Sequence, residues 1–259
     1  MMPSYFFAHG APSLVIEDHE YTQFLKEFAQ TLPKPPKAIV IFSAHWESQV
    51  QQVSYAKQYE TIYDFGGFPD VLYQMTYPAL GDASVSEQVT SLLEQHHIAS
   101  QADDYRGLDH GAWAVLKLIY PQVDIPVIAL SVNRHLSNQQ QYEIGQALGE
   151  LREQDILIIG SGGIVHNLRQ LNWSAADHQV DSWAADFDQW IQERVEQWNI
   201  EELYQYDKLA PFVSQAVPTS EHFIPLLLAM GSGDQNRQAK LLHRSYQYGN
   251  LSLAAWQFN

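Results

Sequence analysis

KAIVIFSA, at residues 37–44, is an unbroken apolar run rich in β-branched side chains, and it leads directly into His45 and Trp46. Continuous apolar character over so few residues is typical of a strand that is covered on both faces of its sheet. Similar runs predict further strands at residues 5–8, 52–55, 126–132, 155–160 and 250–256. The chain therefore has the sequence pattern of a largely parallel, buried sheet.

Longer segments with helical spacing of apolar residues alternate with these strands. The segment 21–31 has apolar residues one helical turn apart and stops before Pro33, which cannot continue a helix. The same reasoning predicts helices at residues 84–96, 111–120, 138–153, 182–197 and 220–230. The alternation predicts an α/β fold in a single domain, residues 1–259, with a mostly parallel or mixed central sheet flanked by helices on both faces. In that architecture ligands bind beyond the carboxyl ends of the strands.

The composition excludes several classes of protein and site. The chain has 30 acidic and 14 basic residues, a formal net charge of −16, and no local basic run, which disfavours nucleic acid as a partner. It has no cysteine, so disulfides, thiolate metal sites and cysteine nucleophiles are absent. No segment reaches the ~18 consecutive apolar residues of a membrane span, and the first residues lack the pattern of a signal peptide. We therefore expect a cytoplasmic protein without a membrane partner; the oligomeric state stays open.

Histidine is frequent, with 11 residues, and three of the predicted strands lead to one. His9 and His45 directly follow two of these strands, and His166 follows a third after a glycine-rich turn. His110 and His222 stand where predicted helices begin. If the strands are neighbours, these imidazoles gather at one edge of the sheet, where neutral imidazole is a suitable ligand for iron, zinc, copper or nickel. The pattern predicts a mononuclear metal centre.

His9 and His45 are the firmest candidate ligands. The third ligand is either Glu221 or His222, because only one of two adjacent residues at a helix start faces a given site. A glutamate would complete a two-histidine, one-carboxylate set, and a histidine would complete a three-histidine set. The histidines in polar surroundings are expected at the surface: His19, His96, His97, His135, His178 and His243.

Six short strings that contain these residues occur in a fixed order: 8–13 (AHGAPS), 43–46 (SAHW), 64–69 (DFGGFP), 108–113 (LDHGAW), 160–168 (GSGGIVHNL) and 221–226 (EHFIPL). Together they resemble the DOPA-dioxygenase-like branch of the class III extradiol ring-cleaving dioxygenases. The resemblance extends from about residue 5 to about residue 256, which is nearly the whole chain.

The resemblance implies a non-haem metal enzyme, normally with iron(II), that opens a catechol ring beside its diol with O₂. Zinc is an alternative bound ion. His9, His45 and His222 match the metal ligands of this branch. His166 matches the acid–base histidine near the metal, with a fourth-ligand role as the alternative. His110 matches the histidine that helps to bind and protonate the substrate, a small catechol.

Four aromatic residues near these histidines are expected to line a pocket for the substrate ring, with packing in the core as the alternative: Trp46, Phe65, Phe68 and Trp113. Asp109 either orients His110 or caps the helix that begins there. Arg106 is a candidate for a local cation, although an exposed loop arginine is the simpler interpretation. Two other functions stay open on the same scaffold: a zinc-dependent hydrolase with His166 as the base, and a non-catalytic metal-binding relative.

Overall fold

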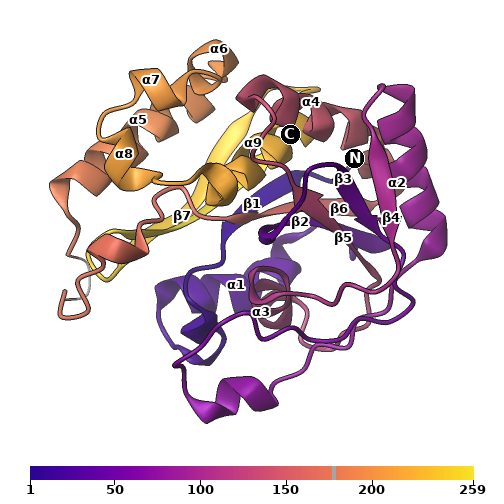
Figure 1. Cartoon of the computed structure of the whole chain (residues 1–259), viewed down its shortest axis with the longest axis horizontal. Helices are drawn as coiled ribbons and strands as arrows, with labels where there is room; N and C mark the ends of the chain where they lie inside the picture. The colour runs from indigo at the N-terminus through magenta and orange to yellow at the C-terminus, as the bar shows by residue number, and fades with distance from the viewer. Residues whose placement is uncertain (177–178) are drawn as a thin grey trace.

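A computed structural model describes residues 1–176 and 179–259 of the chain (Figure 1). Its strands are β1 (Ser4–Ala8), β2 (Ala38–Glu47), β3 (Gln51–Ser54), β4 (Ser100–Asp103), β5 (Val127–Val132), β6 (Ile156–Gly162), β7 (Ala239–Gln247) and β8 (Leu251–Phe258). Its α-helices are α1 (Glu20–Thr31), α2 (Ala83–Gln95), α3 (His110–Ile119), α4 (Asn138–Leu148), α5 (Ser182–Glu196), α6 (Ile200–Leu203), α7 (Tyr206–Leu209), α8 (Val213–Ala216) and α9 (Ile224–Ser232). Short 3₁₀ turns complete them: η1 (Pro12–Ile16), η2 (Asp70–Gln74), η3 (Gly149–Gln154), η4 (Leu168–Gln170) and η5 (Ser220–His222).

The strands of the described residues form one mixed sheet in the order β4-β3-β5-β2-β6-β1-β8-β7. Strands β5, β2, β6 and β1 run parallel, whereas β8 is antiparallel to β1 and to β7. Ala8 at the end of β1 pairs with Gly162, and Ser43 in β2 pairs with Ser161. Because these pairs lie at the same level of the sheet, the residues that follow them emerge side by side.

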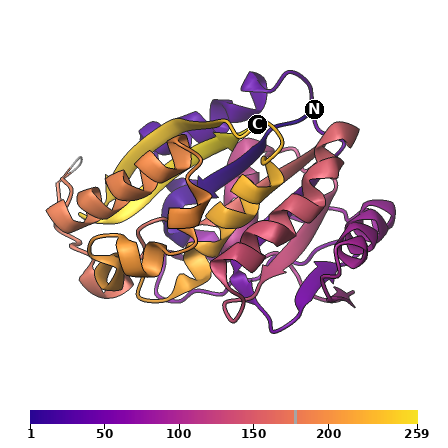
Figure 2. The same ribbon diagram turned by 90° about the horizontal axis from the view of Figure 1, so that it is seen from above.

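Helices cover both faces of the sheet, as the unbroken apolar strands predict. Figure 1 shows α1 and α3 on one side and α4, α5 and α9 on the other, and Figure 2 shows α4 and α9 next to each other above the strands. In β2, Ile39 and Ile41 pack in the core beneath α1 and α3, while Val40 and Phe42 pack with α4. All four are fully buried, and each contributes about 1.5–3 kcal/mol on burial. The predicted α/β fold is therefore confirmed.

Two glycines of β6 let the start of α9 rest directly on the sheet. A Cβ at Gly160 would lie 2.1 Å from the carbonyl oxygen of Pro225, and a Cβ at Gly162 would lie 2.2 Å from that of His222. The amide of Gly163 donates to the same His222 carbonyl at 2.8 Å. Side chains at either position would push α9 away, so these glycines place His222 over the strand ends.

Some elements differ from the sequence prediction. The strands β4 and β7 were not predicted, because both lie at sheet edges and their half-exposed sequences lack a continuous apolar run. The helix predicted at 138–153 ends as α4 at Leu148 and continues as η3. His243 was expected at the surface, but it packs from β7 against Tyr21 and Phe24, with ring centroids 5.0 and 5.7 Å away. His178 lies outside the described residues.

No helix in the described part of the chain combines the length and the apolar character that crossing a bilayer requires.

Candidate active site

Three of the predicted metal ligands meet at the carboxyl edge of the parallel strands. His9 leaves β1, His45 lies near the end of β2, and His222 closes the η5 turn. The Nε2 atom of His45 is 3.1 Å from Nε2 of His9 and 3.3 Å from Nε2 of His222. These rings offer ligand atoms that all lie within 4.8 Å of one another. The strand register explains the convergence, because β1 and β2 both flank β6.

The oxygen atoms beside the outer ring nitrogens indicate which nitrogen carries the proton. The Nδ1 atom of His9 faces Ser161 Oγ at 3.1 Å, that of His45 faces Asp64 Oδ2 at 3.3 Å, and that of His222 faces Glu221 Oε1 at 3.2 Å. Carboxylates only accept hydrogen bonds, and the Ser161 hydroxyl donates to the Gly111 carbonyl, so Nδ1 is the donor in His9 and His222. For His45, the charge of the neighbouring Asp64 carboxylate favours hydrogen on Nδ1. In these tautomers all three Nε2 atoms carry lone pairs.

These lone pairs fit a metal ion. With no proton between them, nitrogen atoms 3.1 and 3.3 Å apart repel one another unless a cation lies between them. Imidazole nitrogens at ~2.1 Å from a metal are separated by ~3.0 Å in octahedral and ~3.4 Å in tetrahedral geometry. The observed spacing falls in this range, and an all-nitrogen set suits iron(II) and zinc. Each ring is also oriented by an oxygen atom, as is usual for histidines that bind metals.

Burial and mutual proximity keep the imidazoles of His9, His45 and His166 neutral, which is the form that binds metals. Burial, followed by the neighbouring histidines, lowers the pKa of His9 well below its usual range. Burial and the charges of His110 and His222 lower the pKa of His45 to about 2, although Asp64 acts in the opposite direction. The pKa of His166 falls to about 3, again mainly because the ring is buried. Near neutral pH these rings therefore offer lone pairs to a cation and do not bind a second proton.

The two remaining predicted histidines lie against this group. The His166 ring stacks on His222, with centroids 3.5 Å apart and planes 8° from parallel. The His110 ring lies 4.1 Å from that of His45 and 5.5 Å from that of His9. All five histidines that the sequence singled out therefore share one site.

Of the two adjacent residues Glu221 and His222, His222 points its ring toward His9 and His45. The Nε2 atom of His222 belongs to the group of three, whereas Glu221 turns Oε1 toward Nδ1 of His222 and also accepts from Thr219 Oγ1 at 2.7 Å. Burial acts to raise the pKa of Glu221, but these hydrogen bonds prevail and lower it to about 2. Glu221 is therefore an ionised acceptor that orients a neighbouring histidine.

Asp64 is a site residue to which the sequence analysis gave no role. Its Oδ1 atom accepts from Nδ1 of His110 at 2.9 Å and from the His110 amide at 3.0 Å, while Oδ2 faces His45. Burial acts to raise its pKa, yet the His110 hydrogen bond and charge prevail and lower the pKa to about 2. In the sequence, Asp64 stands out only because it begins the string at 64–69. That string has no helical or strand periodicity that would show where the side chain points.

Asp109 and Arg106 support the site from behind. Asp109 is the N-cap of α3, where Oδ1 accepts from the Ala112 amide at 3.2 Å, so orienting His110 falls to Asp64. Arg106 is not the exposed loop residue that the sequence suggested. Its side chain is 26% exposed and donates to the His45 carbonyl at 2.9 Å and to Asp109 at 3.1 Å.

The four predicted aromatic residues divide into two pairs. Phe65 stands perpendicular to the His110 ring, with centroids 5.7 Å apart, and Phe68 packs on Phe65 at 5.5 Å. Trp113 is fully buried behind Phe65, and its indole donates to the Ile62 carbonyl at 3.0 Å. Trp46 is also buried, beneath the Arg106 guanidinium. The structure thus places the phenylalanines beside the histidines and the tryptophans in the core.

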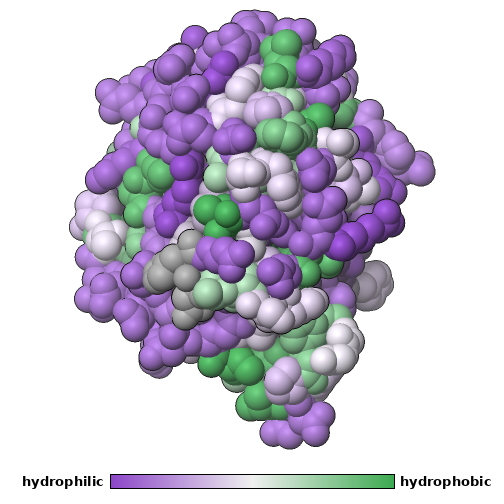
Figure 3. Space-filling view, turned by 90° about the vertical axis from the view of Figure 1, so that its left-hand side faces the viewer, coloured by the Kyte–Doolittle hydropathy of each residue, from purple (hydrophilic) through white to green (hydrophobic). Residues whose placement is uncertain are grey.

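The surface around the site is mixed in character. Figure 3 shows a mainly hydrophilic face with an apolar group toward its lower end, on the side of the sheet that α1 and α3 cover. Tyr73 of η2 is 37% exposed and packs on Phe65 at 5.2 Å, so aromatic residues continue from the histidines toward solvent.

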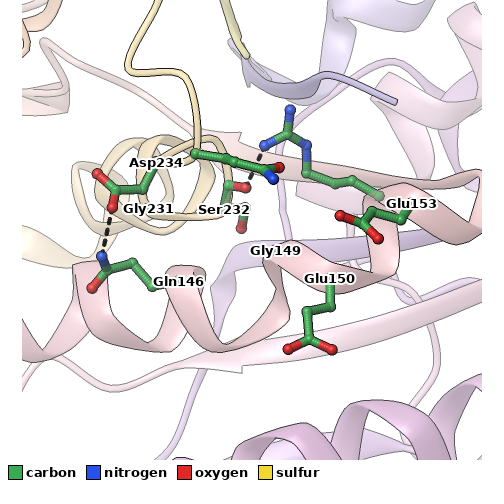
Figure 4. A pocket seen from close by; sticks show the side chains of 9 residues that line it. Gln146, Gly149, Glu150, Glu153, Gly231, Ser232 and Asp234 are labelled. Carbon is green, nitrogen blue, oxygen red and sulfur yellow. Dashed lines mark hydrogen bonds between the residues drawn. The ribbon is translucent and has the colours of Figure 1, made fainter. Parts of the chain in front are cut away.

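A separate hollow of about 230 Å³ lies at the opposite edge of the sheet, between the ends of α4 and α9 (Figure 4). Arg152 in its wall donates to the carbonyls of Met2 and Ser232, and Met2 immediately precedes the start of β1. This hollow contains none of the histidines.

Comparisons with known proteins identify the family of the chain. The family described as the catalytic LigB subunit of aromatic ring-opening dioxygenase matches residues 3–258. A "4,5-DOPA dioxygenase extradiol" from Beta vulgaris is 39% identical over 98% of this chain and 96% of its own length. A protein of the same name from Escherichia coli K12 is 35% identical over 99% of this chain and 94% of its own.

The fold also has a close counterpart among solved structures. The crystal structure of an uncharacterized protein from Escherichia coli K12 superposes with a TM-score of 0.84 at 30% identity, and the match covers 100% of both chains. Sequence, fold and histidine geometry lead to the same assignment, and the chain belongs to the LigB family of aromatic ring-opening dioxygenases.

Proposed function

We propose that this protein opens catechol-type rings beside the diol with O₂, using iron(II) held by His9, His45 and His222. The observation that carries the proposal is the convergence of three Nε2 atoms, each on a ring whose Nδ1 faces an oxygen atom of Ser161, Asp64 or Glu221. Bound iron(II) supplies Lewis acidity toward both catechol oxygens and a path for electrons to O₂. Zinc is an alternative bound ion, because the same ligands accept it.

His110 and His166 are the residues proposed to handle protons. The Nδ1 hydrogen of His110 is engaged by Asp64, so Nε2 is left as an acceptor for a phenolic O–H. His166 lies parallel to His222, so its ring is held next to the metal ligands, where it can take a substrate proton and later return it. Both roles require a neutral ring at the start, and burial supplies this for His166 by lowering its pKa to about 3.

The substrate is proposed to be a small catechol with a side chain, of the DOPA or caffeate type, cleaved at the 4,5 position. The curated relatives named above support this choice through their names, and they give no support to a zinc hydrolase or a non-catalytic protein. Phe65 and Phe68 are proposed to contact the substrate ring from the side of His110. Trp46 and Trp113 are proposed to support this side of the pocket from the core, through contacts with Arg106 and Phe65.

The test is anaerobic reconstitution with iron(II), followed by a catechol panel in an oxygen electrode. We expect O₂ uptake coupled to loss of the catechol and formation of a yellow product. H166Q should bind iron and lose turnover, whereas H96Q, at an exposed histidine that ends α2, should behave as the wild type. Iron-loaded protein that leaves every catechol unchanged would refute the proposal. Activity of the zinc form under nitrogen would favour a hydrolase instead.

A further inference from the structure

We propose that Asp64 is a positioning residue that fixes His45 and His110 together, so that one carboxylate sets both a metal ligand and the imidazole that faces the substrate. The inference rests on the proposed function for these two roles, but its contacts are features of the fold. Ser161 and Glu221 each orient a single ring of the site. Asp64 accepts a hydrogen bond from His110 and makes an ion-pair contact with His45, so this one carboxylate contacts two of the five site histidines.

The contacts divide between the two carboxylate oxygens. Oδ1 receives two hydrogen bonds from His110, one from Nδ1 at 2.9 Å and one from the amide at 3.0 Å. Oδ2 lies 3.3 Å from Nδ1 of His45. The two rings are held with centroids 4.1 Å apart and planes at 50°. Because an ionised carboxylate only accepts, Nδ1 of His110 carries hydrogen. The negative charge of Asp64 beside Nδ1 of His45 favours hydrogen on that nitrogen as well, and in these tautomers both Nε2 atoms carry lone pairs.

The loop that carries Asp64 is fastened to the start of α3, so the position of the carboxylate is part of the fold. The Ile62 amide donates to the Leu108 carbonyl at 2.8 Å, and the Ile62 carbonyl accepts from the Trp113 indole at 3.0 Å. His110 is the first residue of α3, where amide groups have no partner within the helix. Asp64 Oδ1 accepts a hydrogen bond from the His110 amide, and this bond anchors the Asp64 side chain to the start of α3.

An asparagine at this position cannot make the same contacts. Its amide offers one acceptor oxygen and one donor nitrogen, so it can accept from only one of the two rings. If the oxygen faces His110, the NH₂ group faces Nδ1 of His45 and favours the tautomer that puts hydrogen on Nε2. That hydrogen occupies the lone pair that a metal needs. If the amide is reversed, its NH₂ group opposes both donors of His110. D64N therefore separates the two functions of the carboxylate, although it barely changes the volume.

The test uses zinc(II) alone and needs no catechol. Long-range ¹H–¹⁵N spectra of zinc-loaded, ¹⁵N-histidine-labelled wild-type protein should show Nδ1–H for both His45 and His110, assigned with single histidine-to-glutamine variants. Calorimetry should show that D64N binds zinc about 10- to 100-fold more weakly than the wild type. It should also lose the Nδ1–H signature of at least one of the two rings. The matched control is D70N, an exposed aspartate six residues further along, which should leave both readouts unchanged.

Two results would overturn the inference. One is an Nε2–H tautomer for either ring in the wild type, a measurement that requires no variant to fold. The other is D64N protein that binds zinc as tightly as the wild type with both ring signatures intact. Failure of the proposed function gives a different result, in which zinc binding and both tautomers are as expected but iron-loaded protein does not consume O₂ with catechols.

Discussion

Replacing Gly111 with alanine tests the spacing of the histidines without removing any of them. Gly111 lies in the first turn of α3, directly behind the rings of the proposed ligands His9 and His45. An added Cβ would lie 2.8 Å from Ser43 Oγ, 2.9 Å from Cδ2 of His45 and 3.1 Å from Nδ1 of His9. These distances are too short for non-bonded atoms, so either the proposed ligands His9 and His45 or the start of α3 must move.

The size of the movement follows from these contacts. Carbon atoms in contact are separated by at least ~3.5 Å, so the His45 ring or the helix must shift by about 0.5 Å. A metal site tolerates displacements of only about 0.2 Å in its ligand distances. We therefore expect zinc affinity to fall by about tenfold or more, equivalent to ~1.4 kcal/mol. Overpacking costs ~1–3 kcal/mol of stability, offset in part by the ~1 kcal/mol that alanine gains over glycine in a helix.

The assay is calorimetric titration with zinc, together with urea unfolding of the metal-free protein. G66A is the matched control, because a Cβ at Gly66 has no atom within 4 Å and should change neither affinity nor stability. The expected pattern for G111A is a folded protein, destabilised by about 1 kcal/mol, with clearly weaker metal binding. G111A protein that binds zinc as tightly as the wild type would show that the rings behind Gly111 do not form the metal site.

Three further predictions concern the surroundings of the site. H222A should abolish stoichiometric metal binding, because it removes a proposed ligand. E221Q should weaken metal binding only about tenfold, because Glu221 orients the His222 ring and is not itself a proposed ligand. Calorimetric titration of both variants with zinc measures the difference. Burial lowers the pKa of His9 and His166, so both rings are neutral in the folded state. In the unfolded state a histidine has its ordinary pKa of about 6.5. Between this pH and about pH 3, the lowered pKa of His166, the unfolded state therefore binds more protons than the folded state. The metal-free protein should thus lose stability as the pH falls from 7.5 to 5.5, by about 1 kcal/mol per histidine, and a flat urea midpoint over this range would contradict it. F65A should raise KM for catechols without altering zinc affinity, because the Phe65 ring packs on His110, which is not a proposed ligand. Steady-state kinetics and calorimetry test this, and an unchanged KM with weakened zinc binding would contradict it.

The fold and the gathering of the histidines could be predicted because they depend on strands with strong local patterns. The apolar runs that precede His9 and His45 belong to strands buried on both faces, and parallel strands of one sheet end at a common edge. The register that pairs Ala8 with Gly162 then brings the histidines together. No single residue has to be placed accurately for this inference to hold.

The details that escaped prediction depend on contacts between distant segments. Glu221 and His222 are adjacent, and the choice between them is made by the way η5 docks on Gly162. Asp64 lies in a loop, where no periodicity shows which way a side chain points. For Trp113 the sequence left pocket lining and core packing open, and the contact of its indole with the Ile62 carbonyl is made within the core. Such outcomes require the assembled structure.

Anomalous diffraction at the iron edge, from crystals grown anaerobically with iron(II), tests the central claim most directly. We predict one strong peak about 2.1 Å from each Nε2 atom of His9, His45 and His222. We expect no peak at the second group of possible ligand atoms, which His45, Asp64 and His110 form. A peak at any other position would contradict the proposed site. So would the absence of a peak at these three histidines in protein that nevertheless opens catechols.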